Sequence, residues 1–201
     1  VNKKPNHKFI FANLFSYLSI ILTSKNNIPN SYIKILHEIS HYLEPSLGNS
    51  NYFLAEIYSN EKNFKIALNK LNRIHQNSFM FLYSRIKKYK ILKIVDKNKS
   101  NSLLKSIEKK YPENNEVLSL IANNYKDQNK CDKAIEVYNK LIALSKNNYN
   151  YKYLKAICLD KLNKWEDSKK ILIKLISENP NDAYALNYLS YSMAIRDENL
   201  I

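Results

Sequence analysis

Three segments of the chain repeat one another, and this self-similarity constrains the fold more than any other feature. Residues 54–74 (LAEIYSNEKNFKIALNKLNRI) align without gaps with residues 121–141 (IANNYKDQNKCDKAIEVYNKL), and residues 155–175 (KAICLDKLNKWEDSKKILIKL) fit the same frame. In a repeat array each unit buries its apolar face against its neighbours, and stacking builds one continuous core. The chain is therefore predicted to be an array of similar units.

The matching positions indicate two helices in each unit. Small residues recur where the two helices would cross closely, and larger apolar residues recur one turn away. Pro45, Pro112 and Pro180 lie where the second helix of a unit would end, because proline cannot continue a helix. The predicted structural positions are Leu54, Ala55, Tyr58, Phe64, Ala67, Ile121, Ala122, Tyr125, Ala134, Tyr138, Ala156, Trp165, Ser168 and Pro180.

The aligned units resemble tetratricopeptide repeats (TPRs), which are helix–turn–helix units of about 34 residues. The resemblance implies an all-α fold, a right-handed α-solenoid of antiparallel helix pairs. Residues 87–107 would be a degenerate repeat, with Lys88 where a small residue is expected, and residues 1–9 a flexible segment. A single array would cover residues 10–201, with approximate repeats 10–47, 48–80, 81–114, 115–148 and 149–182, and the first helix of a further repeat at 183–197.

A finer likeness concerns the runs YLEP, FLAEIYSNEKNFKIAL and NKWEDSKKILIKLISENPNDAYALNYLSYSMAIRDENL. They are similar to segments of long TPR proteins of alphaproteobacteria, which implies an internal piece of a longer bacterial array, in the cytoplasm, the periplasm or at the envelope. The last helix would then lack its partner. We expect Leu186, Leu189 and Met193 to be exposed there, as a surface for self-association or another partner.

Residues 37–41 (HEISH) match H-E-x-x-H, the signature in which two zinc-binding histidines lie one helical turn apart beside a glutamate base. Glu61 follows twenty residues after the second histidine. However, a zinc peptidase also needs a third ligand, an open coordination position and a substrate cleft. The repeat frame instead places the motif in a second helix, with Ser40 at the small-residue position and Ile39 and Leu43 facing inward. We therefore predict no catalytic residue, metal or cofactor, and a zinc-dependent hydrolase remains an alternative.

The N-terminal region contains an apolar segment in which Phe11, Leu14, Leu18, Ile21 and Leu22 share one helical face. Although a basic start followed by apolar residues also resembles a signal segment, the spacing favours an amphipathic helix packed in the core. No stretch approaches the roughly 20 apolar residues that a membrane span requires.

The resemblance implies a non-enzymatic scaffold that binds a peptide or partner protein, of unknown identity, in a concave groove lined by the first helices. The family's groove positions correspond to Tyr52, Glu56, Arg85, Tyr89, Ser119, Asn123, Tyr153, Tyr184, Asn187 and Tyr191. The clamp that some TPR proteins use for C-terminal carboxylates is not expected, because Ser119 and Leu154 replace two of its residues and only Asn123 matches.

The net charge of +14 suggests an alternative, a basic module that binds acidic partners or nucleic acid. The excess is nearly all lysine, since Arg73, Arg85 and Arg196 are the only arginines. Bidentate readout of phosphate and guanine favours arginine, so nucleic acid is the less favoured of these partners.

Overall fold

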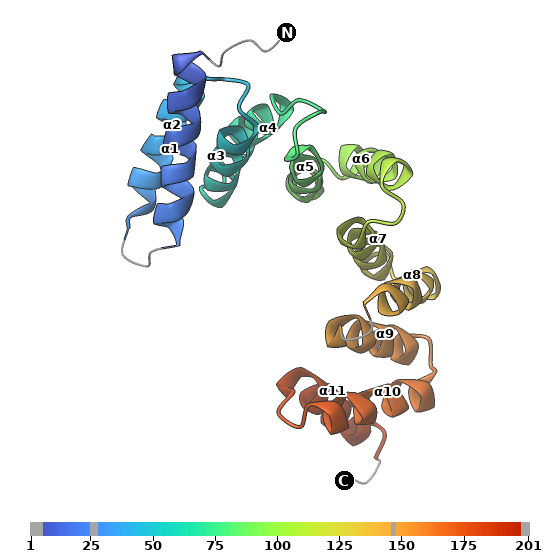
Figure 1. Cartoon of the computed structure of the whole chain (residues 1–201). Coiled ribbons are helices and arrows are strands. Elements are labelled where there is room, and N and C mark those ends of the chain that lie inside the picture. Colours follow the sequence, from blue (N-terminus) through green and yellow to red (C-terminus); the bar gives the residue numbers. More distant parts are fainter. Residues whose placement is uncertain (1–5, 25–27, 146–147, 198–201) are drawn as a thin grey trace. The chain divides into compact units, whose positions relative to one another are not determined.

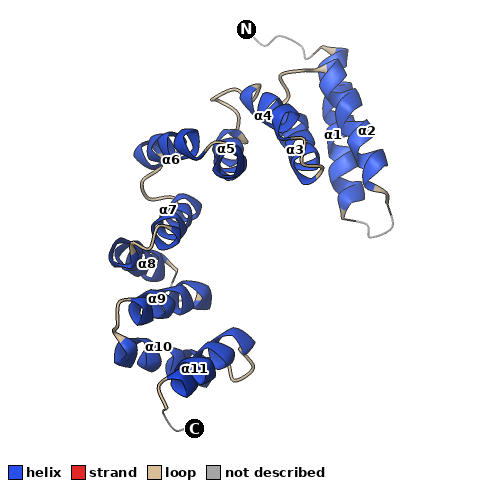
Figure 2. Cartoon of the chain, turned by 180° about the vertical axis from the view of Figure 1, so that it is seen from behind, coloured by secondary structure: helices blue, strands red, loops and turns tan. Residues whose placement is uncertain are grey.

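The computed structural model describes residues 6–24, 28–145 and 148–197, and within these ranges it contains eleven α-helices and no strand (Figures 1 and 2). This confirms the prediction of an all-α helical-repeat fold. The helices are α1 (His7–Thr23), α2 (Asn30–Leu43), α3 (Gly48–Asn60), α4 (Phe64–Asn72), α5 (Phe81–Val95), α6 (Lys97–Lys110), α7 (Asn115–Asp127), α8 (Cys131–Leu144), α9 (Tyr149–Lys161), α10 (Trp165–Glu178) and α11 (Ala183–Ile195).

The chain divides into two compact units, residues 1–107 and 108–201. In the first unit α1 packs on α2, α2 on α3, and both α3 and α4 on α5. In the second unit the helices from α7 to α11 each pack on the next one along the chain. Both units are therefore built from contacts between sequence neighbours, as stacked repeats require.

The turns inside the repeats share one backbone conformation. Three residues separate α3 from α4, α7 from α8, and α9 from α10. The middle residue of each turn has a positive φ: 62° at Lys62, 57° at Asn129 and 59° at Asn163. Asp197, directly beyond α11, also has a positive φ (52°), and the positions 129, 163 and 197 are separated by 34 residues each. The positive-φ residues of the backbone thus recur with the same 34-residue period as the sequence repeats.

Each of these turns ends a helix with a Schellman motif, in which the residue after the left-handed one bonds back to the last helical turn. The backbone N–H groups of Asn63, Lys130 and Lys164 donate to the carbonyl oxygens of residues five positions earlier, at 2.8, 2.9 and 2.9 Å. The hydrogen bonds satisfy carbonyl groups that would otherwise lack a partner at the helix end.

The predicted degenerate repeat differs at this turn. Only Asp96 lies between α5 and α6, and its φ of −157° is extended rather than left-handed. Lys88, at the expected small position, instead donates a hydrogen bond from Nζ to Asn72 Oδ1 at 2.7 Å. The helix pair α5–α6 therefore lacks the turn of the other repeats and the small residue of their first helix, although Ser100 is buried at the small position of its second helix.

Close helix crossings occur at small, fully buried residues. Ala55 and Ala67 lie in the core of the α3–α4 pair, and Ala122 and Ala134 in that of α7–α8. In two other pairs a serine hydroxyl reaches across the crossing to an alanine carbonyl oxygen. The Ser168–Ala156 bond between α10 and α9 is 2.8 Å long, and the Ser40–Ala12 bond between α2 and α1 is 2.7 Å long. The helix pairs are thus held close by residues that leave room for the neighbouring backbone.

The α1 prediction is wrong in its orientation. Phe11, Leu14, Leu18 and Ile21 are exposed, and the residues that α1 buries are Ala12, Ser16 and Ser19. The small residues face α2 because the crossing is close, which turns the large ones outward. On α2, Ile39 is likewise exposed, although Ser40 is buried as predicted. We define the N-terminal apolar face as the exposed large side chains of both helices, namely Phe9, Ile10, Phe11, Leu14, Tyr17, Leu18, Ile21, Tyr32, Ile35, Ile39 and Tyr42.

At the other end, the expectation for α11 holds for one residue of three. Leu186 is exposed, but Met193 is buried and Leu189 is half-buried, because both pack in the cluster that contains Trp165 and Leu172. Among the helices that the structure describes, none is long and apolar enough to cross a membrane.

We predict that Lys62→Gly stabilises the chain by about 1 kcal/mol, because glycine adopts a positive φ without the steric cost that lysine has there. The matched substitution Lys105→Gly, at an exposed position inside α6, should instead destabilise by about 1 kcal/mol. Urea unfolding of both variants measures this, and equal effects of the two substitutions would contradict the turn geometry.

Candidate functional site

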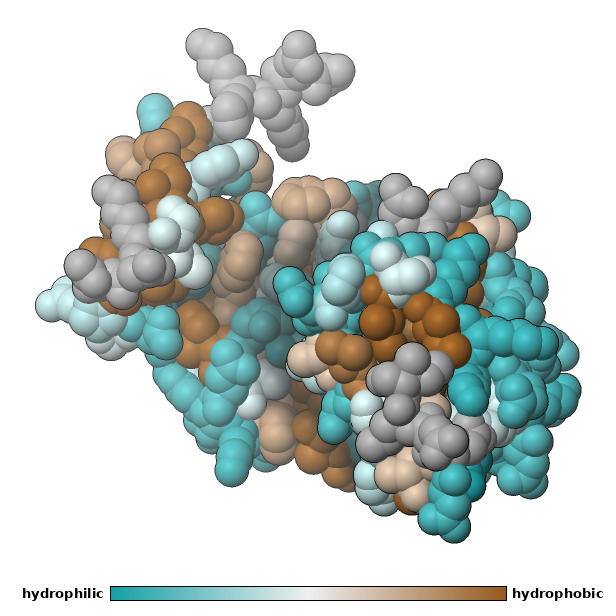
Figure 3. All heavy atoms as spheres, turned by 90° about the horizontal axis from the view of Figure 1, so that it is seen from below, coloured by the Kyte–Doolittle hydropathy of each residue, from teal (hydrophilic) through white to brown (hydrophobic). Residues whose placement is uncertain are grey.

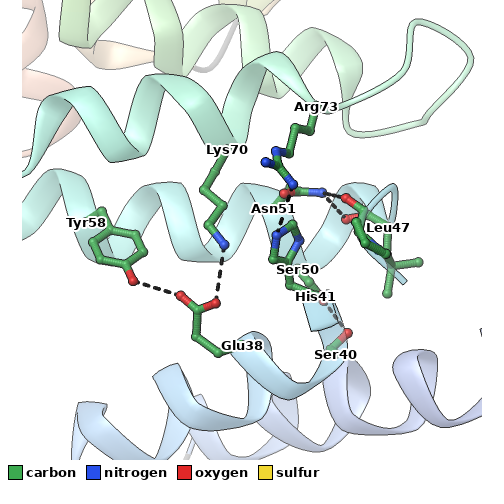
Figure 4. Close-up of polar contacts among 10 residues, drawn as sticks. Glu38, Ser40, His41, Leu47, Ser50, Asn51, Tyr58, Lys70 and Arg73 are labelled. Carbon is green, nitrogen blue, oxygen red and sulfur yellow. Dashed lines mark hydrogen bonds and ion pairs between the residues drawn. The ribbon is translucent and has the colours of Figure 1, made fainter. Parts of the chain in front are cut away.

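The glutamate of the HEISH segment connects three helices (Figure 4). The Glu38 carboxylate, on α2, accepts a hydrogen bond from the Tyr58 hydroxyl of α3 at 2.8 Å and from Lys70 Nζ of α4 at 3.3 Å. Burial, and then the hydrogen bond with Glu38, raise the pKa of Tyr58 to about 12, so this hydroxyl keeps its proton. Glu38 therefore joins the first helix pair to the second.

The first histidine of the segment is a core residue. His37 is 1% exposed, and its ring stacks on Phe53 of α3 with ring centroids 5.1 Å apart. Its Nε2 lies 2.9 Å from Ser19 Oγ on α1. The Ser19 hydroxyl already donates to the Ser16 carbonyl oxygen at 2.6 Å, so the His37 nitrogen is the donor in this contact. Burial lowers the pKa of His37 to about 4, and the ring is neutral at pH 7.

The second histidine points toward a different helix. His41 Nε2 lies 3.4 Å from an Arg73 guanidinium nitrogen (Figure 4), and because arginine only donates, this ring nitrogen is the acceptor. Burial and then the charges of Lys70 and Arg73 lower the pKa of His41. Positive charge beside this nitrogen would also repel a metal ion.

The predicted candidate for a third zinc ligand is engaged elsewhere. Glu61, in the α3–α4 turn, forms an ion pair with Lys34 Nζ at 2.8 Å. Across residues 6–24, 28–145 and 148–197, no three histidine, cysteine, aspartate or glutamate side chains are placed to hold a metal ion. The two histidines that would be zinc ligands instead contact other side chains, His37 those of Ser19 and Phe53 and His41 that of Arg73.

A cavity of about 600 Å³ lies in the first unit beside this network. Ile33, His37, Phe53 and Ile57 form apolar and aromatic parts of its lining, and Tyr52, Glu56 and Glu61 also line it. Glu56 is paired with Lys87 Nζ at 3.0 Å, so both carboxylates have a lysine partner. The cavity is therefore largely apolar, with its two acidic groups neutralised by the chain's own lysines.

The second unit has a smaller cavity of about 390 Å³, lined by Tyr149, Asn150, Tyr153, Asp182 and Tyr184. The Tyr153 ring lies 6.4 Å from that of Tyr184 and 6.1 Å from that of Tyr188, centroid to centroid. The Tyr188 hydroxyl donates to Asp160 Oδ2 at 2.9 Å, which fixes the ring at the edge of this group. We call Tyr153, Tyr184 and Tyr188 the tyrosine cluster.

Four of the residues predicted to line the groove border these cavities: Tyr52 and Glu56 in the first unit, and Tyr153 and Tyr184 in the second. Tyr89 is only 3% exposed and borders neither cavity, so its contact with a ligand stays a prediction. It lies in the α5–α6 pair, whose turn differs from those of the other repeats.

The other predicted groove residues lie outside the cavities. Asn123 Oδ1 accepts a hydrogen bond from the Tyr138 hydroxyl at 3.2 Å, and the Arg85 guanidinium lies 5.9 Å from the Phe81 ring centroid. Ser119 is half-buried, while Asn187 and Tyr191 are exposed.

Several residues that line the cavities were not predicted to do so. His37 lies on a second helix and was considered only as a metal ligand, and Phe53 lies on a first helix but outside the groove positions of the family. Asp182 could have been recognised in the sequence as a helix cap, because it directly precedes the last helix. Its carboxylate accepts hydrogen bonds from the Tyr184 and Ala185 amides at 3.0 and 3.1 Å.

We predict that the first unit loses stability as the pH falls from about 6.5 to 4. The unfolded chain binds a proton at His37 near pH 6.5, whereas the folded pKa of about 4 delays protonation. The loss attributable to His37 should approach about 3 kcal/mol at pH 4.

In urea unfolding across this pH range, His37→Gln should remove that part of the pH dependence, although it lowers stability at neutral pH. His75→Gln, at an exposed histidine, is the matched control and should leave the wild-type profile intact. A His37→Gln profile parallel to that of the wild type would show that His37 is not the responsible group.

Comparisons with known proteins agree with this architecture. Residues 125–189 match the family model described as tetratricopeptide repeat, and no curated protein matches the chain. Among solved structures, residues 41 to the end of MamA from Desulfovibrio magneticus RS-1 superpose with a TM-score of 0.67 and 15% identity, covering 89% of this chain and 99% of that one.

Two further structures are similar. YrrB, described as a TPR protein with an unusual peptide-binding site, has a TM-score of 0.63 and 14% identity over 90% of this chain and 89% of its own. Yeast Tom70 has a TM-score of 0.67 and 18% identity over 94% of this chain and 41% of its own. Residues 125–189 are thus matched as tetratricopeptide repeats, and the chain has the fold of proteins built from them.

Proposed function

We propose that the chain is a non-enzymatic scaffold that binds a peptide segment of a partner protein. Its residues 10–201 would act as one TPR array, with the ligand on the first helices of the repeats. The observation that carries this proposal is that predicted groove residues border a cavity in each unit, Tyr52 and Glu56 in one and Tyr153 and Tyr184 in the other. A TPR fold supports a protein-interaction role in general, and the peptide site is our specific claim.

The cavity of the first unit favours an uncharged apolar side chain as the anchor of that peptide. Its volume of about 600 Å³ accommodates a large aliphatic or aromatic group, and Ile33 and Phe53 offer apolar contacts. His37 is neutral at pH 7, and Glu56 and Glu61 are paired with Lys87 and Lys34. A charged anchor would therefore lose its hydration without gaining an unpaired counter-charge.

The cavity of the second unit favours contacts with peptide backbone. Tyr184 is 77% exposed, so its ring and hydroxyl are accessible to a ligand beside the more buried Tyr153. Tyrosine provides a large contact area at low conformational-entropy cost, and asparagine both donates to and accepts from peptide groups. Asn150, with Asp182, lies at the same cavity. This cavity thus combines the aromatic surface of Tyr153 and Tyr184 with the polar groups of Asn150 and Asp182.

A second candidate is an electrostatic binder of acidic partners, which the net charge of +14 favours. The two candidates differ in their salt dependence. An apolar anchor retains most of its affinity as ionic strength rises, whereas binding through lysines to an acidic ligand weakens steeply.

We predict that peptides selected from a random displayed library against this chain bind through these cavities. Asn60 lines the first cavity and is exposed, so Asn60→Trp should fill the cavity without removing a core contact. Tyr184→Ala truncates the exposed ring of the second cavity. Each selected peptide should lose about tenfold in affinity, about 1.4 kcal/mol, with at least one of these variants, measured by fluorescence anisotropy.

Matched controls are Asn69→Trp, at an exposed asparagine of α4, and Tyr83→Ala, at an exposed tyrosine of α5. Both should bind every selected peptide as the wild type does. Peptides that bind equally well to all four variants would contradict the proposed site. Affinity that disappears at moderate salt would favour the acidic-partner candidate instead.

A further inference from the structure

A helix pair whose surface contacts water usually has apolar side chains inside and polar side chains outside. The first helix pair, α1–α2, has the opposite distribution. Its buried residues are the small or polar Ala12, Ser16, Ser19, His37 and Ser40, together with one large apolar residue, Ile33. Its surface carries the eleven side chains of the N-terminal apolar face. Hydrophobic residues accordingly gather on the surface of this helix pair in the space-filling view (Figure 3). Contiguous apolar surface of this kind marks an interaction site in a folded chain.

Hydroxyl groups of this pair form hydrogen bonds inside it. Ser40 Oγ donates to the Ala12 carbonyl oxygen at 2.7 Å, and Ser19 Oγ donates to the Ser16 carbonyl oxygen at 2.6 Å and contacts His37. At the end of α1, Thr23 Oγ1 donates to the Ser19 carbonyl oxygen at 2.8 Å. These three hydroxyl groups are satisfied within the pair and are not needed at its outer face, whereas the buried Ser16 Oγ has no hydrogen-bond partner.

Helix α8 has the ordinary arrangement. Its exposed residues include Asp132, Lys133, Glu136 and Lys140, and its interior contains large apolar side chains such as Leu141. Helix α11 also exposes large side chains, Tyr184, Leu186 and Tyr191, while it buries Ala185 and Ser192. Exposed apolar side chains are therefore gathered on particular helices and do not follow from the apolar content of the chain as a whole.

The charge of this region matches a negatively charged surface. Residues 1–43 contain five lysines and a single acidic residue, Glu38. Glu38 is engaged with Tyr58 and Lys70, and Lys34 is paired with Glu61, so each of these two charges is offset by a partner within the chain. The remaining positive charge of this region comes from Lys8, at the start of α1, and from the lysines at positions 3, 4 and 25. An anionic lipid bilayer offers both an apolar layer and negative headgroups to such a surface.

We propose that the N-terminal apolar face binds peripherally to an anionic lipid bilayer, beyond the peptide-binding role proposed above. Leu14, Leu18 and Ile21 enter the outer part of the acyl layer while α1 and α2 lie along the membrane surface. Tyr17, Tyr32 and Tyr42 are suited to the headgroup region, because tyrosine combines an apolar ring with a polar hydroxyl.

Vesicle co-sedimentation with the whole chain tests the proposal. The probes are vesicles of phosphatidylcholine alone and vesicles that also contain phosphatidylglycerol. The wild type should sediment with the anionic vesicles and much less with the neutral ones. A Leu14→Ser/Ile21→Ser variant, which leaves the charge unchanged, should bind the anionic vesicles about tenfold more weakly.

The matched control is Ile66→Ser/Ile94→Ser, which replaces two exposed isoleucines of α4 and α5 and should bind as the wild type does. Circular dichroism melting of both variants verifies that they are folded. Failure of the wild type to bind anionic vesicles would overturn the proposal, as would equal binding by the folded Leu14→Ser/Ile21→Ser variant. A wild-type dimer in lipid-free solution that this variant abolishes would assign the face to a second copy of the chain, and would likewise overturn it.

Discussion

The structure depends on close crossings of paired helices at small buried side chains. At Ala55 and Ala67, and at Ala122 and Ala134, a larger residue would force the two backbones apart. Where serine takes the position, as at Ser40 and Ser168, its hydroxyl satisfies a carbonyl oxygen across the crossing. The side chains that this requirement turns inward determine which residues are left to line the cavities and to form the exposed faces.

The helix pairs could be predicted from sequence because the same requirement recurs with a fixed period. Alanine or serine at matched positions, with proline beyond the second helix, indicated the repeats and the fold class. The left-handed residues Asn129 and Asn163 carry the same period in the backbone. These features are local, so a single sequence is enough to reveal them.

What could not be predicted depends on which face of a helix a neighbour covers. The apolar residues of α1 were expected in the core, but Ala12 and Ser19 take the buried positions because they allow α2 to approach. Met193 was expected to be exposed, yet α11 packs it against the cluster around Trp165. Similarly, Tyr89 occupies a groove position by register but is buried, in the helix pair whose turn differs from those of the other repeats. The HEISH segment also shows this limit, since spacing alone does not tell whether histidines one turn apart face a metal or neighbouring helices.

The most direct measurement of the central claim compares two identical substitutions on α8. Ala134→Leu places a large side chain at the crossing with α7, whereas Ala143→Leu places it at an exposed position of the same helix. Our account predicts that Ala134→Leu lowers the free energy of unfolding by about 1–3 kcal/mol or more in urea titration, and that Ala143→Leu changes it by less than about 0.5 kcal/mol. Equal stability of the two variants would show that the crossing is not a close contact, and would contradict the account.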